Sequence, residues 1–257
     1  MGRGLSRPSA GVAVLALCAA LLPWLVAAVL PPIAQPQSYH AFADQRALWG
    51  VPNAFDVISN LPFLVVGLLG LFALPKAMAR DATPRAARAP WLAMFCGVAL
   101  TALGSAAYHL DPTDATLVWD RLPMALCFAG LVAGTLADRT ARPGWLLPCA
   151  LAASGVGSVA FWAQSGNLAP YLAAQVGFLA VALAATALVR SPYTHAAWLY
   201  GAAAFYGGAM LAERLDHAIA ALLGGRVSGH TLKHLLAAAA IYVVYRMLLR
   251  RRRGPTA

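Results

Sequence analysis

Charged side chains are scarce in this sequence. Asp, Glu, Lys and Arg make up only 11% of its 257 residues, while 61% are hydrophobic. Soluble globular domains carry about 25% charged residues, so this composition excludes an ordinary soluble domain. It indicates that lipid rather than water solvates most of the chain. We therefore interpret the protein as integral to a membrane.

Cysteine is also rare, and its placement excludes two further kinds of site. The four cysteines lie inside apolar stretches, and no two have the CxxC spacing: Cys18, Cys96, Cys127 and Cys149. They are typical of small buried hydrophobic residues and predict neither a disulfide framework nor a cysteine metal site. The sequence also lacks repeats, soluble inserts and nucleic-acid-binding motifs.

Long apolar runs are what the sequence does contain. A membrane-spanning helix needs about 20 mostly apolar residues, and Pro, Gly and charged residues separate such runs here. Eight stretches qualify: 11–31, 57–75, 91–110, 120–137, 144–163, 170–189, 196–215 and 230–249. We predict an all-α fold, a polytopic membrane helix bundle that forms one integral membrane domain over residues 1–257.

The basic residues predict the orientation of these spans. The net charge is +10, and nucleic acid is not needed to explain it, because basic residues collect in the cytoplasmic loops of membrane proteins. With the N-terminus inside, only five of the 19 Lys and Arg residues fall outside: Arg46, Arg121, Arg214, Arg226 and Lys233. Both termini are then cytoplasmic, and residues 250–257 form a basic cytoplasmic tail near anionic lipids.

The first apolar run has a second interpretation. MGRGLSR followed by residues 11–31 also resembles a signal peptide. We favour a retained helix, because the run is long and AVLPPIAQ is a poor cleavage site. If it were removed, seven spans would remain in the same orientation.

Five polar residues lie where the predicted spans should be apolar. Ser105 and His109 are four residues apart at the end of the third span, and Asp120 opens the fourth. His230 and His234, also four residues apart, open the last span. Residues at i and i+4 share a helical face, and the topology places all five at the same outer depth. Ionisable groups inside a membrane are functional candidates, so we expect one site.

These five residue types suit a zinc hydrolase. His109, His230 and His234 provide three imidazole ligands and leave a fourth position for water, whose pKa zinc lowers to about 7. The Asp120 carboxylate can transfer protons, and the Ser105 hydroxyl can donate to a developing oxyanion.

Each residue also has an ordinary interpretation. An HxxxH pair alone is a weak metal signal, and Thr231 excludes the HExxH protease motif. Ser105 is also typical of a helix-packing residue, and Asp120 of an acid favoured by the helix dipole. The arrangement of all five residues, rather than any one of them, favours a metal site.

Other polar residues near this depth are weaker candidates. Glu213, Asp216 and His217 either orient the zinc histidines, or they are solvated or pair with Arg214 and Lys233. We favour solvation or such pairing. His40 and His195 lie in predicted loops, and we expect them to be exposed.

The motif set resembles the alkaline ceramidase family, within the CREST superfamily of membrane hydrolases. The resemblance rests on Ser105-x3-His109, Asp120 and His230-x3-His234, with Ser59-Asn60 in the first core span, and covers residues 42–249. It implies a seven-helix core and zinc held by the three histidines, with Asp120 and Ser105 catalytic. The implied reaction is hydrolysis of a ceramide-like membrane lipid to a sphingoid base and a fatty acid.

Two features depart from that family. The helix at 11–31 is additional to the seven-helix core, and calcium binding is in doubt, because AFADQRALWGVPN offers Asp44 and Asn53 but no cluster of Glu. The superfamily also includes lipases that act on acyl esters, so an ester substrate stays open. A lipid-binding or receptor-like protein with a structural zinc is the alternative from another class. A transporter is disfavoured, because no chain of acids crosses the inner half of the spans.

Overall fold

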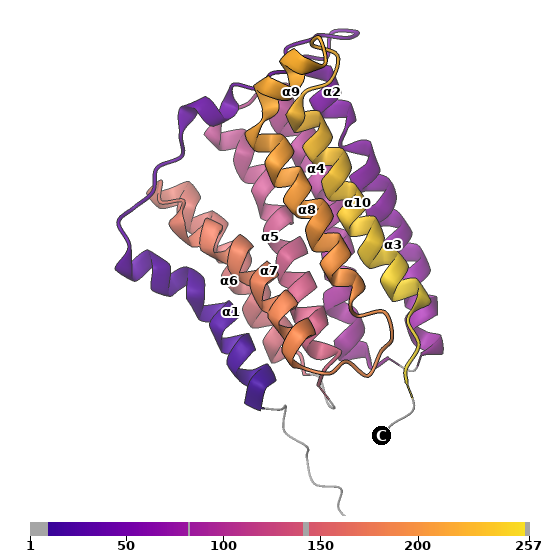
Figure 1. Cartoon of the computed structure of the whole chain (residues 1–257). Helices are drawn as coiled ribbons and strands as arrows, with labels where there is room; N and C mark the ends of the chain where they lie inside the picture. Colours follow the sequence, from indigo (N-terminus) through magenta and orange to yellow (C-terminus); the bar gives the residue numbers. More distant parts are fainter. Residues whose placement is uncertain (1–9, 82, 141–143, 255–257) are drawn as a thin grey trace, which may run out of the picture.

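The computed structural model describes residues 10–81, 83–140 and 144–254 (Figure 1). Helices dominate these residues, and no strand occurs among them. The helices are α1 (Ala10–Val29), η1 (Gln37–His40), α2 (Ala54–Ile58), α3 (Leu61–Arg80), α4 (Arg85–Leu110), α5 (Asp114–Ala137), α6 (Leu146–Ser165), α7 (Ala169–Leu188), α8 (Trp198–Arg214), α9 (Asp216–Leu222) and α10 (Gly229–Arg250). The predicted all-α bundle is confirmed.

Seven segments of the described chain are long and apolar enough to cross a membrane. They are α1, the joined α2 and α3, α4, α5, α6, α7 and α10, so this is a multi-pass membrane protein. The predicted span at 196–215 corresponds to α8, which has 17 residues. At 1.5 Å per residue α8 is about 25 Å long, shorter than the ~30 Å hydrocarbon core of a bilayer.

Helices α4 and α5 form the centre of the bundle. Helix α3 packs on α4, and α10 packs on both α3 and α8, while α6 and α7 cover the other side of α5. Helix α1 lies at the edge against α6 and α7 (Figure 1). Helix α1, which the sequence predicts as additional to the other helices, is therefore peripheral.

A close backbone approach joins α4 to α5. A Cβ atom at Gly104 would lie 2.0 Å from the Trp119 carbonyl oxygen, and one at Gly130 would lie 2.6 Å from the backbone of Met94. Small residues let membrane helices approach this closely. Because Gly104 and Trp119 precede Ser105 and Asp120 in the chain, the contact brings these two candidate residues together.

The two ends of the bundle hold different helices and different charged residues. Helix α1 begins and α10 ends at one end, whereas α2 and α9 lie at the other (Figure 1). Arg80, Arg85 and Arg190 lie at the first end, where α3 and α7 end and α4 begins. The predicted inner residues Arg3, Arg7 and Arg142 lie outside the described residues.

The basic tail is not wholly solvated. Arg251 is only 2% exposed, and its guanidinium donates to the Asp138 carboxylate at 2.5 Å and lies 4.1 Å from the Tyr193 ring centroid. The Trp91 indole also donates to Asp138, at 3.1 Å. The sequence predicts an anchor near anionic lipids, but Arg251 instead pairs with a buried carboxylate at the end of α5, which requires a cation.

Replacing Arg251 with alanine is expected to destabilise the protein by about 3–5 kcal/mol, because it leaves Asp138 buried without its charge partner. Thermal unfolding of the purified protein in detergent measures the loss. Arg252→Ala is the matched control, since Arg252 is exposed and its removal should cost less than about 0.5 kcal/mol. An equal loss of stability in the two variants would contradict the role of this ion pair.

Candidate metal centre

Three histidines from two helices meet at the end of the bundle where α2 and α9 lie. His109 is in the last turn of α4, and His230 and His234 are in the first two turns of α10. One ligand nitrogen from each lies within 4.8 Å of the others, and all three side chains are buried. Their ring centroids are 4.7–5.1 Å apart. The convergence predicted from the spans is confirmed.

Three nitrogens of these rings are buried without a protein partner. Both ring nitrogens of His109 and Nε2 of His230 have no hydrogen-bond partner. Buried polar atoms in proteins are normally paired, so these orphaned nitrogens call for a ligand. Three buried imidazoles with free nitrogens could therefore hold a metal ion.

The third ring is held in one tautomer. The Ser59 hydroxyl donates to the Asp56 carbonyl at 2.9 Å and lies 2.7 Å from Nδ1 of His234. Because that hydroxyl has one proton and gives it to Asp56, Nδ1 of His234 carries the proton and donates to Ser59. Nε2 of His234 then keeps its lone pair, as a metal ligand requires.

Backbone contacts fix the other two histidines. Asn53 donates from Nδ2 to the His109 carbonyl at 2.8 Å, and the Asp216 carboxylate accepts the His230 N–H at 2.8 Å. Glu213 Oε1 lies 3.9 Å from Nδ1 of His230. Asn53 and Asp216 thus hold the backbone at the two histidines, and a carboxylate near a ring nitrogen, as Glu213 is, can orient a metal-binding imidazole.

The interpretation of Glu213, Asp216 and His217 is correct in part. Glu213 forms an ion pair with Lys233, as the favoured alternative held, and His217 is exposed. Asp216 is instead buried, and its second oxygen accepts the Ala43 N–H at 2.8 Å. The prediction of a solvated Asp216 is wrong, because its carboxylate is buried and accepts hydrogen bonds from two backbone N–H groups.

The residues considered for calcium bind protein groups. Asp44 is buried, accepts the backbone N–H groups of Phe55 and Asp56, and pairs with Arg46 at 2.8 Å. Asn53 is engaged with the His109 carbonyl, as described above. This segment therefore supports the start of α2 and the histidine group.

Ser105 and Asp120 lie beside the histidines. Both are buried, and the Ser105 side chain forms a hydrogen bond with the Asp120 carboxyl group. They line the same cavity as His234 and Lys233. All five predicted site residues therefore gather at one end of the bundle.

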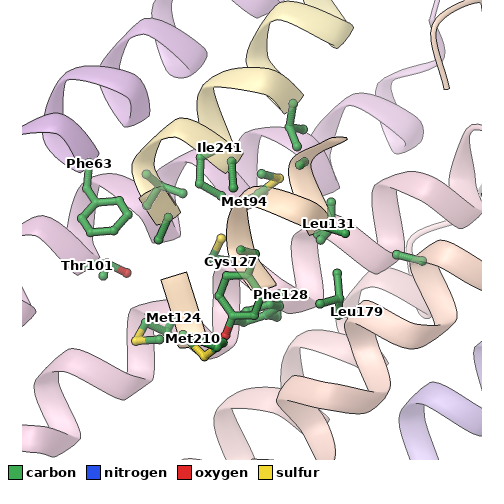
Figure 2. A pocket seen from close by; sticks show the side chains of 18 of the residues that line it. Phe63, Met94, Thr101, Met124, Cys127, Phe128, Leu131, Leu179, Met210 and Ile241 are labelled. Atoms are coloured by element: carbon green, nitrogen blue, oxygen red, sulfur yellow. The ribbon is translucent and has the colours of Figure 1, made fainter. Parts of the chain in front are cut away.

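An apolar cavity extends from this polar end into the bundle. The space between its lining atoms, including the part that is open to the outside, is about 980 Å³, and residues of α3, α4, α5, α7, α8 and α10 line it. Figure 2 shows the labelled side chains of Met94, Met124, Cys127, Phe128 and Ile241 around this space. Nearly all the lining atoms are carbon or sulfur.

The length of the cavity follows from the helices that line it. Along α10 the lining residues run from Lys233 to Val244, which is about 17 Å at 1.5 Å per residue. The cavity is therefore long and mostly apolar, with Ser105, Asp120, Lys233 and His234 in its lining, and it can receive an alkyl chain with a polar head.

Residues 37–44 cover the histidines from the opposite side. The Phe42 ring centroid lies 4.7 Å from that of His109 and 4.4 Å from that of His230. The Tyr39 hydroxyl donates to Glu213 at 3.1 Å. Burial, and then the Glu213 charge, raise the pKa of Tyr39 well above its usual value, so its hydroxyl keeps the proton. Bulk water is thus excluded on this side.

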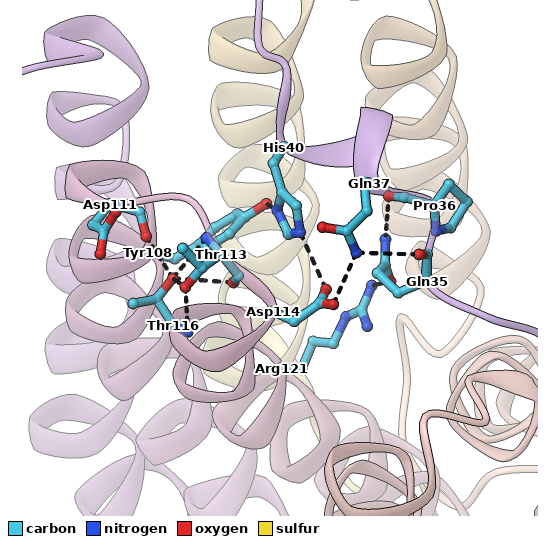
Figure 3. A network of polar contacts seen from close by, with 10 residues as sticks. All are labelled: Gln35, Pro36, Gln37, His40, Tyr108, Asp111, Thr113, Asp114, Thr116 and Arg121. Carbon is cyan, nitrogen blue, oxygen red and sulfur yellow. Dashed lines mark hydrogen bonds and ion pairs between the residues drawn. The ribbon is translucent and has the colours of Figure 1, made fainter.

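A polar network fixes this covering segment. Nδ1 of His40 lies 2.8 Å from the Tyr108 hydroxyl, and Nε2 lies 3.1 Å from the Asp114 carboxylate (Figure 3). Gln37 donates to the same carboxylate at 2.9 Å. The His40 side chain is only 11% exposed, so the prediction of an exposed His40 is wrong. The exposure of His195 is confirmed.

The sequence interpretation missed Phe42 and Asp56. An aromatic residue in a loop gives no signal, since its role depends on what it covers. Asp56 had a signal, because it is an acid at the start of an apolar span, as Asp120 is.

In comparisons with known proteins, no family model and no curated protein matches this chain. The resemblance to alkaline ceramidases thus depends on the motif residues alone.

Proposed function

We propose that this protein is a zinc-dependent intramembrane amidase that hydrolyses the N-acyl amide of ceramide-like lipids. The products are a sphingoid base and a free fatty acid. The observation that carries the proposal is a buried group of three imidazoles, one of which, His234, lines an apolar cavity inside the bundle. A membrane lipid has the same division between one polar region and its alkyl chains.

His109, His230 and His234 are the residues that would hold the metal. Three neutral imidazole nitrogens favour zinc over calcium or magnesium, which prefer oxygen ligands. Zinc bound there would supply a hydroxide nucleophile at neutral pH.

The remaining residues of the site serve proton transfer and charge stabilisation. The reaction forms a C–O bond at the amide carbonyl and breaks the C–N bond. Asp120 would accept a proton from the attacking water and return it to the leaving nitrogen. Ser105, beside it, would donate to the oxyanion that develops on the carbonyl oxygen.

The apolar cavity and the covering residues 37–44 determine what can reach the histidines. The apolar walls receive an alkyl chain of the lipid, while Phe42 and Tyr39 keep bulk water from the histidines. Substrate then enters from the bilayer. A low-dielectric site of this kind strengthens each electrostatic interaction within it.

We also propose the orientation predicted from the sequence, with both termini cytoplasmic and the metal centre toward the outer side. Arg80, Arg85, Arg190 and Arg250 lie at the helix ends opposite the histidines, as the positive-inside rule favours for cytoplasmic ends.

Two alternatives remain outcomes of the test. An acyl ester fits the same cavity and chemistry as an amide. A lipid-binding protein with a structural metal is favoured by one observation, that the histidines join α4 to α10, because a metal there would tie two helices together.

Purified protein incubated with a panel of N-acyl and O-acyl lipids tests the function. We expect about one zinc ion per chain, release of fatty acid from N-acyl sphingoid lipids, and loss of release when a chelator removes the metal. Mass spectrometry of the released acids and elemental analysis make the measurement.

The panel also separates the alternatives. Release from esters alone would reject the amidase in favour of a lipase. Binding of lipid and metal without release from any lipid would favour the structural role. Protein purified without metal, and unable to bind added zinc, would reject the whole proposal.

A further inference from the structure

Asp56 carries a fully buried carboxyl group that the proposed reaction does not use. It lies in α2 with 0% of its surface exposed. Its Oδ1 accepts hydrogen bonds from the hydroxyls of Ser228 at 2.9 Å and Thr231 at 2.6 Å. Its Oδ2 has no partner, and no Lys or Arg within residues 10–81, 83–140 and 144–254 forms an ion pair with it. A buried carboxylate without a cation is costly unless a positive charge lies nearby.

The two hydroxyls that bind Asp56 belong to the first turn of the ligand helix. Ser228 is the N-cap of α10 and accepts the Thr231 N–H at 2.8 Å. His230 lies between these two residues, and His234 follows one turn later. Through these two hydrogen bonds, Asp56 holds the first turn of α10, which carries His230, against α2.

The ligand helix has little freedom to shift at this point. A Cβ atom at Gly229 would lie 2.2 Å from the Ala212 carbonyl oxygen and 2.6 Å from Cα of Asp216. The start of α10 is thus held by close packing on one side and by Asp56 on the other.

Asp56 also reaches the second ligand through its backbone. Its carbonyl accepts the Ser59 hydroxyl, which in turn accepts the Nδ1 proton of His234. The side chain of Asp56 thus acts on the turn that holds His230, and its carbonyl group acts on His234 through Ser59.

We infer that Asp56 is a positioning residue of the metal centre, whose carboxylate holds the ligand helix and supplies the buried negative charge that offsets a bound dication. The inference rests on the metal of the proposed function. Residues that act through the ligands in this way typically change metal affinity by about 10–100-fold when mutated.

Metal affinity of the full-length protein in detergent tests this role without any lipid substrate. Metal-free protein is titrated with Co²⁺, whose visible absorption reports coordination, and Zn²⁺ is measured by competition. Asp56→Asn retains an oxygen acceptor for both hydroxyls but removes the charge. We expect its Kd for Co²⁺ and Zn²⁺ to rise about 10–100-fold, with unchanged thermal unfolding of the metal-free protein.

Asp138→Asn is the matched control, because Asp138 is also buried but lies at the opposite end of the bundle. Its Kd should equal that of the wild type. If Asp56→Asn does not fold, Thr231→Val removes one docking bond and should raise Kd and alter the Co²⁺ spectrum.

A Kd for the folded Asp56→Asn protein within about threefold of the wild-type value, well short of the expected range, would overturn the inference. An unchanged Kd for Thr231→Val, where that variant is needed, would do the same. Failure of the wild type to bind either metal would instead count against the proposed function. Metal binding without lipid turnover would also reject that function, but it would leave the role of Asp56 measurable.

Discussion

Alanine in place of His230 is expected to abolish metal binding and fatty-acid release together. The change removes one of three buried imidazoles whose ligand atoms lie within 4.8 Å of each other. Two protein ligands hold zinc far more weakly than three, and without the metal the attacking water keeps the high pKa of bulk water. Release from an N-acyl lipid should therefore fall by roughly 1,000-fold or more. Elemental analysis and mass spectrometry of the acid measure both effects in one preparation.

His195→Ala is the matched control for this experiment. His195 is an exposed histidine that precedes α8, at the end of the bundle opposite the metal centre. Its replacement should leave zinc content and release unchanged. A His230→Ala protein that keeps both its metal and its activity would contradict the centre. One that loses release but keeps metal would assign His230 to another role.

Most of the helical fold could be predicted because the signal is local. An apolar run of membrane length identifies a span wherever the rest of the chain goes. The ends were less accurate. Helix α5 was predicted from Asp120 but begins at Asp114, where Thr113 and Thr116 form a capping box. Hydropathy marks the apolar part of a helix, whereas capping determines where it begins.

The histidine group could be predicted for a related reason. The i, i+4 spacing of His230 and His234 fixes a shared face within one helix. The topology then places the end of α4 at the same depth in the membrane as the start of α10. Both steps use short-range information and the alternation of spans across the bilayer.

The supporting residues could not be found in this way. Asp56 meets Thr231 across 175 positions in the sequence, and His40 meets Asp114 across 74. Contacts of this kind depend on how helices rotate and pack, which no local pattern records. The same limit explains Arg251, since the sequence does not indicate which of four consecutive arginines faces a buried acid.

Asparagine in place of Asp120 is expected to keep the metal but lose most of the lipid turnover. The side chain lines the cavity beside His234 and bonds to Ser105, and an amide of the same shape can still accept that hydrogen bond. It cannot accept a proton from the attacking water or return one to the leaving nitrogen. General acid–base catalysis contributes about 100- to 10,000-fold, so kcat should fall within that range. Zinc content and the unfolding temperature should match those of the wild type.

The control for this variant comes from the same helix. Asp138→Asn makes the identical change at a second buried carboxyl group, at the far end of α5, and its folded fraction should turn over lipid at the wild-type rate. Turnover by Asp120→Asn at that rate would remove Asp120 from the chemistry. Loss of zinc in Asp120→Asn would instead make the carboxylate a structural support of the histidines. Only retained metal combined with lost release separates an enzyme from a lipid-binding protein that uses its metal to join helices.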